Sequence, residues 1–177
     1  MAVGNWLRAA GVPVSSFVGG QAHTRPRLKR LKDRWALFPD IPLTFYQDQL
    51  AAAIAHLKRG RVLAMALDGI NGRQMQLPVA DGWTFRLATG PFRLARQHQT
   101  LLMACNIYNE KPWHVAVEVG TPVDPAILAA GDEPAGAAIL ADLWPLLRAH
   151  PQDWYPELAA RFSRTSDLPA MAGQDGP

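Results

Sequence analysis

Apolar residues recur along most of the chain in patterns typical of helices and strands. In Phe45–Lys58 they lie four and three positions apart, the spacing of one helical face. Arg61–Leu67 follows as a nearly continuous apolar run of strand length, which is typical of a strand covered on both faces. A helix that leads into a buried strand favours an α/β fold.

The rest of the chain predicts further elements of the same two kinds. They are a strand in Gly11–Val18, a hairpin of Met75–Val79 and Trp83–Leu87, a helix from Pro91 to His98, strands in Thr100–Ile107 and Trp113–Val119, and a helix through Ile139–Leu147 that Pro145 kinks or restarts. This order predicts a mixed, largely buried sheet flanked by helices. We expect one domain over residues 1–162 and a flexible tail over residues 163–177.

Composition narrows the class of protein. The chain has 177 residues, of which 49% are hydrophobic and 19% charged, values that suit a single globular domain. Its apolar runs are far shorter than the roughly 18–20 residues that span a bilayer, and Pro13, Ser15 and Ser16 interrupt any signal-peptide core. Cys105 lies in an apolar run, which predicts a buried thiol and a reducing, cytoplasmic compartment.

Positive charge is concentrated in one short segment, although the net charge is only +3. Within residues 24–35, Leu28, Leu31 and Trp35 have helical spacing among six cations. Such a segment, including Arg27 and Arg30, either binds an anionic membrane surface or is a solvated basic face. Aromatic residues are not interleaved as in single-strand nucleic-acid binders, so no nucleic acid is expected as a partner.

Several motifs, in order, resemble the bacterial lipid A biosynthesis acyltransferases, which belong to the lysophospholipid-acyltransferase-like superfamily. In that family a strand ends in an aspartate, a Gly-Pro pair opens a helix with a Leu-Ala pair, and a His-Pro-x-x-Trp segment precedes an Arg-aromatic pair. The matching segments here are Leu57–Gly60, the strand that ends at Leu67-Asp68, Thr89–Ala95, Leu147–Trp154 and Arg161-Phe162.

The resemblance implies transfer of a fatty acyl group from an acyl thioester to a lipid or glycolipid hydroxyl at the cytoplasmic face of the inner membrane. The donor would be acyl carrier protein or coenzyme A carrying the acyl group, the acceptor an anionic lipid, and no cofactor would be required. Family members are longer and carry a His-x4-Asp/Glu motif. Gly4-Asn5-Trp6 echoes its middle, but Ala2 and Leu7 occupy the places of the catalytic pair, so we expect an incomplete domain that begins inside the motif or has lost it.

Acyl transfer requires a base for the hydroxyl proton and an acidic residue that orients the base. No histidine of the chain has an acidic residue five positions later, so no catalytic residue is identifiable. For His56, His98 and His114 we favour solvated surface positions. The cysteine and histidine spacings also give no metal site. The histidines are His23, His56, His98, His114 and His150.

The loop after the second predicted strand is the position most typical of ligand binding. Asp68 and Gly69 begin it, and Arg73 ends it. Backbone amides and a guanidinium in such a loop can hold a phosphate or carboxylate, and α/β proteins bind ligands beyond strand ends. The alternative for Asp68 is an Asx turn, and for Gly90 a simple helix start.

Three functions are therefore compatible with the sequence. The first is an acyltransferase-family protein that lacks its catalytic motif. The second is a non-catalytic protein of the same fold that binds anionic lipid or phosphate, with Asp68, Gly69, Arg73, Gly90, Arg27 and Arg30 as substrate-binding residues. The third is a nucleotide- or sugar-phosphate-binding domain unrelated to acyl transfer.

Overall fold

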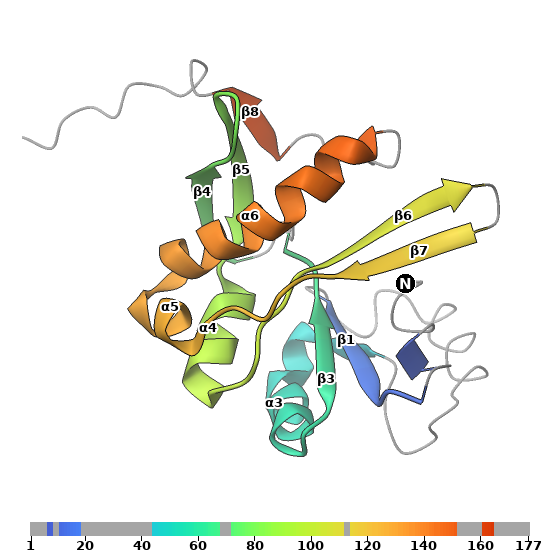
Figure 1. Cartoon of the computed structure of the whole chain (residues 1–177). Coiled ribbons are helices and arrows are strands. Elements are labelled where there is room, and N and C mark those ends of the chain that lie inside the picture. Colours follow the sequence, from blue (N-terminus) through green and yellow to red (C-terminus); the bar gives the residue numbers. More distant parts are fainter. Residues whose placement is uncertain are drawn as a thin grey trace, which may run out of the picture.

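The computed structural model of the chain describes residues 7–8, 11–18, 44–67, 72–111, 114–151 and 161–164 (Figure 1). Its first part is a parallel sheet that contains a βαβ connection. The strands are β1 (Val14–Val18), β2 (Thr44–Tyr46) and β3 (Val62–Met65), in the order β2-β1-β3. Phe17 of β1 lies opposite both Phe45 and Met65. The strands predicted in Gly11–Val18 and Arg61–Leu67 are thus confirmed.

Helix α3 (Leu50–Lys58), preceded by the 3-10 turn η2 (Gln47–Gln49), connects β2 to β3. Its last turn holds His56, which is 2% exposed and whose Nε2 donates to the carbonyl of Val62 at 3.0 Å. The ring of Phe45 packs edge-on against this imidazole at 5.3 Å. The helix predicted in Phe45–Lys58 is confirmed from Leu50, but Phe45 and Tyr46 at its expected start form β2. The surface position expected for His56 is also wrong, because its side chain is buried where α3 meets the start of β3.

The second part is an antiparallel sheet of β4 (Gln74–Pro78), β5 (Trp83–Ala88) and β8 (Phe162–Arg164), in the order β4-β5-β8. The predicted hairpin is confirmed as β4 and β5, which pair in register from Gln74 with Ala88 to Pro78 with Thr84. Ser163 and Arg164, the first residues of the expected tail, belong to β8.

Three helices accompany this sheet: α4 (Gly90–His98), α5 (Pro125–Ala130) and α6 (Asp132–Ala149). Figure 1 shows α6 lying across β4 and β5. Leu87 and Ile139, which are 0% and 1% exposed, belong to the core cluster that this packing forms, and a Cβ on Gly136 would meet the Leu77 side chain at 2.7 Å. The two predicted helices are confirmed, and α6 runs through Pro145 without a restart.

The third part is a hairpin of β6 (Cys105–Lys111) and β7 (His114–Val119), which extends away from the other two parts (Figure 1). Its pairs run from Cys105 with Val119 to Lys111 with His114, with an irregularity between Asn109 and Lys111. Two contacts attach it to α6. The Tyr108 and His150 rings stack at 3.8 Å, and the Thr121 amide donates to Asp142 Oδ2 at 2.7 Å.

The α/β class is confirmed, but the single buried sheet is not: the described residues form three small sheets. The strand expected in Thr100–Ile107 begins only at Cys105. Cys105 is exposed rather than buried, and Val62 of β3 is 42% exposed. Both errors have one cause. A continuous apolar run predicts a strand that is covered on both faces, whereas in the structure one face of each strand is exposed.

Candidate functional site

The carboxyl ends of the parallel strands lie at one edge of their sheet. Val18 ends β1 beside the chain that leaves β3 at Ala66, since Phe17 pairs with Met65. The chain leaves this edge toward the basic segment after Val18 and toward the Asp68 loop after Leu67. Ligands of α/β proteins bind at such an edge, so two sequence-predicted segments depart from the position where a ligand is expected.

Two backbone hydrogen bonds attach the ends of the Asp68 loop to the junction of β5 and α4. The Ala88 amide donates to the Leu67 carbonyl at 2.7 Å, before the loop, and the Thr89 amide donates to the Arg73 carbonyl at 3.0 Å, after it. The loop therefore starts and ends beside the first residues of α4. This arrangement brings Arg73 and Gly90, two of the predicted binding residues, to one place.

Thr89 holds this junction together and was missed as a site residue. Its side chain is 4% exposed, and its Oγ1 donates to the Arg73 carbonyl at 3.1 Å. A threonine before Gly-Pro is a common helix start, and its hydroxyl would ordinarily cap the helix. Here the hydroxyl binds the loop instead, and the α4 N-terminus has no side-chain cap. The Thr-Gly-Pro sequence was the available signal.

Two helix starts and an arginine lie at this edge, together with Asp48 in the first turn after Tyr46. The turn and helix that begin after Tyr46 start at the carboxyl end of β2, and α4 starts at Gly90. Free amides and the macrodipole at a helix N-terminus favour an anion. Arg73 is exposed, and its backbone carbonyl is bound by Thr89, which precedes the uncapped start of α4. A Cβ on Gly90 would meet nothing within 4 Å, so space is open there.

The remaining predicted binding residues are Asp68, Gly69, Arg27 and Arg30, and all four lie outside the described residues. The structure shows only where the chain leaves the sheet toward these residues, after Val18 and after Leu67. Arg73 and Gly90 are therefore the predicted site residues that the structure places. Their shared contact is Thr89, which bonds the Arg73 carbonyl and directly precedes Gly90.

No histidine in the described part of the chain forms an ion pair with a described carboxylate. Burial lowers the pKa of His56, as do the nearby cations Arg61, Arg8 and Arg59, while the hydrogen bond to the Val62 carbonyl partly offsets this effect. The His56 ring is held in the protein interior by this bond, and its lowered pKa favours the neutral form. His114 is exposed, as expected, and His150 stacks on Tyr108.

Two other groups of nucleophile type, Cys105 and Tyr108, have raised pKa values. Partial desolvation raises the pKa of the Cys105 thiol, which disfavours the reactive thiolate. Desolvation and Glu118, which accepts a hydrogen bond from Tyr108, raise the pKa of that phenol. In the described ranges, no group of three or more His, Cys, Asp or Glu side chains is placed to hold a metal ion. The described helices include none that is long and apolar enough to cross a membrane.

Comparison with known proteins gives no relative: no protein-family model and no curated protein matches this chain. The interpretation of the site therefore depends on its geometry and on the sequence resemblance.

Proposed function

We propose that this chain binds the phosphate group of an acyl donor or an anionic lipid at the carboxyl edge of the parallel sheet. One observation supports this function above the others. Hydrogen bonds from Ala88 and Thr89 hold both ends of the Asp68 loop against the open start of α4. Loop amides, a helix N-terminus and an arginine are the groups that bind phosphate in proteins.

The ligand class follows from the resemblance to lipid A acyltransferases. Coenzyme A thioesters, acyl carrier protein and the lipid acceptor of that family all carry phosphate, so one anion site would serve either a donor or an acceptor. We place the protein at the cytoplasmic face of the inner membrane as a peripheral protein. This is the non-catalytic alternative among the functions that the sequence allows.

Acyl transfer is the second candidate. Its support is the start of α4 at Gly90-Pro91 immediately after the loop-binding Thr89, which is the order of elements in the resembling family. Release of free coenzyme A from lauroyl-CoA in the presence of a lipid A precursor tests it. Turnover above the background rate would establish the enzyme, and its absence alongside saturable ligand binding supports the non-catalytic function.

A titration with two soluble phosphate compounds tests the binding function. Coenzyme A represents the donor and dihexanoyl phosphatidic acid the lipid, and isothermal calorimetry measures their Kd. Arg73→Gln removes a charge-assisted contact, so we expect about tenfold weaker binding, equivalent to about 1.4 kcal/mol.

Arg59→Gln provides the matched control. Arg59 is also exposed, but it lies in the turn between α3 and β3, at the opposite end of β3 from Leu67. Its replacement should leave the Kd unchanged. No saturable binding of either compound by the unmodified chain, or an equal loss in both variants, would contradict the site.

A further inference from the structure

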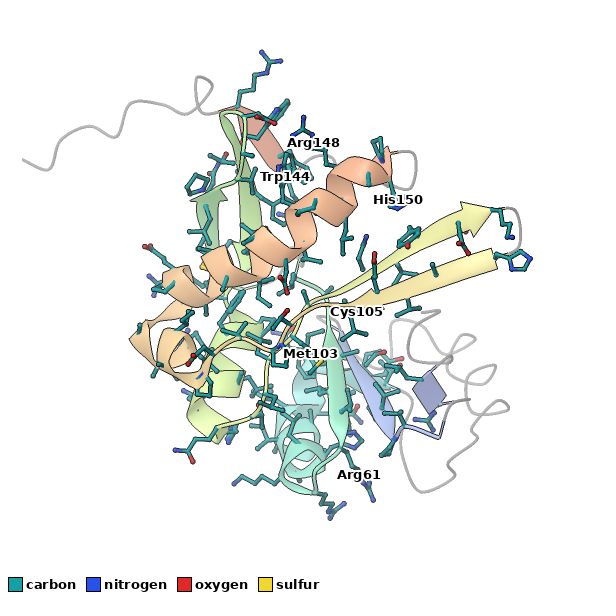
Figure 2. All side chains as sticks on the ribbon, in the orientation of Figure 1. Arg61, Met103, Cys105, Trp144, Arg148 and His150 are labelled. Atoms are coloured by element: carbon teal, nitrogen blue, oxygen red, sulfur yellow. The ribbon has the colours of Figure 1, made fainter. Side chains whose placement is uncertain are left out.

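Alternate residues from Leu101 onward form an exposed apolar row. Leu101 is 72% exposed, Met103 42% and Ile107 39%, and Cys105 between them is exposed as well. Figure 2 shows Met103 and Cys105 where the chain enters β6. Side chains two residues apart lie on one face of an extended chain, so these four share a face.

The intervening residues face the protein interior. Ala104 is 1% exposed, and Leu102 packs against the core cluster. Two backbone hydrogen bonds join the segments before β6 and after β7: the Gly120 amide donates to the Ala104 carbonyl at 3.0 Å, in the register of the hairpin, and the Val123 amide donates to the Leu102 carbonyl at 2.8 Å, one residue out of that register. The row is therefore fixed in place, with one face buried and the other exposed.

Strand β7 widens the exposed row. Val119 is 53% exposed and lies opposite Cys105, and half-buried Val117 lies opposite Ile107. Tyr108, on the other face, stacks on His150 of α6 and bonds Glu118. The apolar face thus points away from α6. We name Leu101, Met103, Cys105, Ile107 and Val119 the apolar stripe.

The size of the apolar stripe decides between two partners. Five partly exposed side chains of this kind present on the order of a few hundred Å², the size of the largest apolar patch on a typical monomer, which is often functional. A stable protein interface requires about 800 Å² from each partner, which one face of a two-stranded hairpin does not supply. A bilayer requires no such minimum, because each apolar group that enters it contributes separately.

We propose that the apolar stripe lies on a lipid bilayer. Lys111 and His114, the last described residue of β6 and the first of β7, are exposed at the far end of the hairpin, and basic side chains of this kind interact with anionic lipid headgroups. Glu118 lies on the opposite face, beside Tyr108, and so stays in water. This surface is separate from the phosphate site, and neither requires the other.

The only cysteine of the chain lies within the stripe and serves as its probe. Acrylodan attached to Cys105 should shift its emission to the blue with vesicles of phosphatidylglycerol and phosphatidylethanolamine, and doxyl-labelled lipids should quench it. For the control, Cys105→Ala with Ile127→Cys moves the dye to α5, where Ile127 is also 39% exposed. There we expect neither shift nor quenching.

Unlabelled protein provides the second measurement. Ile107→Thr with Val119→Thr keeps the β-branched shape and should reduce vesicle partitioning about tenfold in flotation, because two apolar groups no longer enter the bilayer. Ile127→Thr with Val62→Thr changes the same residue types at other exposed positions and should leave partitioning unchanged.

Four results would overturn the proposal. They are no flotation of the unmodified chain, equal loss in the two double variants, flotation without any shift at Cys105, and a shift without vesicles that grows with protein concentration. The last result would indicate a second copy as the partner. Coenzyme A titration of the same preparations tests the phosphate site independently, so the two proposals can fail separately.

Discussion

The body formed by α6 and the β4-β5-β8 sheet differs from the β6–β7 hairpin in how its apolar residues are used. In the body, Leu87 of β5 and Ile139 of α6 belong to one core cluster and are 0% and 1% exposed. In the hairpin, Ile107 and Val119 remain 39% and 53% exposed. Strand β5 of the body and strand β7 of the hairpin both contain strand-forming, apolar residues. The presence of a second layer, rather than local sequence, decides which residues become core.

The largest expected difference in the free energy of unfolding is between one truncation in the body and one in the hairpin. Leu87→Ala leaves a cavity in a fully buried position and should lower the free energy of unfolding by about 3 kcal/mol. Ile107→Ala removes a partly exposed side chain, and a loss under about 1 kcal/mol is expected. Urea unfolding measures both. Similar losses would mean that the hairpin face is covered in solution.

The pH dependence of stability tests a third region, where His56 of α3 is buried beside the parallel sheet. The pKa of His56 is lowered from 6.5, so the unfolded chain binds the proton more tightly than the folded one. Stability from the neutral ring is complete above 6.5 and decreases below it, by at most about 1.4 kcal/mol per pH unit, until the pH reaches the folded-state pKa. His56→Gln should flatten this part of the profile. Urea unfolding at several pH values checks it, and an unchanged slope in the variant would contradict it.

Removing the ring stack tests how the hairpin is attached to the body. His150→Ala abolishes the contact with Tyr108, and a loss of about 1 kcal/mol is typical for a ring pair. We expect faster amide hydrogen exchange in β6 and β7, with little change in β5. Uniform acceleration throughout the protein would show that hairpin and body open together.

Two ion pairs give the smallest difference. Arg96 Nη1 and Asp132 Oδ1 join α4 to the first turn of α6 at 2.6 Å, with side chains 35% and 22% exposed. Arg148 and Asp81 pair at 2.9 Å but are 65% and 57% exposed. Asp132→Asn should cost about 1 kcal/mol, including its helix-dipole term, and Asp81→Asn almost nothing. Thermal unfolding compares them, and equal shifts would reverse the ranking.

Local patterns predicted most elements correctly. The period of the apolar residues located α3, and Pro91 after a strand located the start of α4. Burial was predicted less well. The burial of His56 depends on Phe45 and Val62 around it, and a charged-looking helix end contains no sign of that packing.

The candidate site shows the same limit. The loop residues at Asp68 and Arg73 were predicted from their position after a strand, a purely local signal. Thr89 was not, because its contribution is a contact with a carbonyl sixteen positions away in the chain. Hydrogen bonds of this range depend on how β4 and β5 pair, which no short motif specifies.

The hairpin is attached to α6 at two separate points, through Tyr108 to His150 and through the chain after β7 to Asp142. Asp142 lies within α6 and His150 directly follows it, eight positions and about 12 Å farther along the axis. A Cβ on Gly120 would lie 2.7 Å from Asp142 Oδ2, so a side chain there would displace the carboxylate that accepts from Thr121. A hairpin held by one contact can pivot about it, whereas two separated contacts fix its direction. A force on the hairpin tip is therefore transmitted to α6, and the helix sets the angle at which the tip meets any surface.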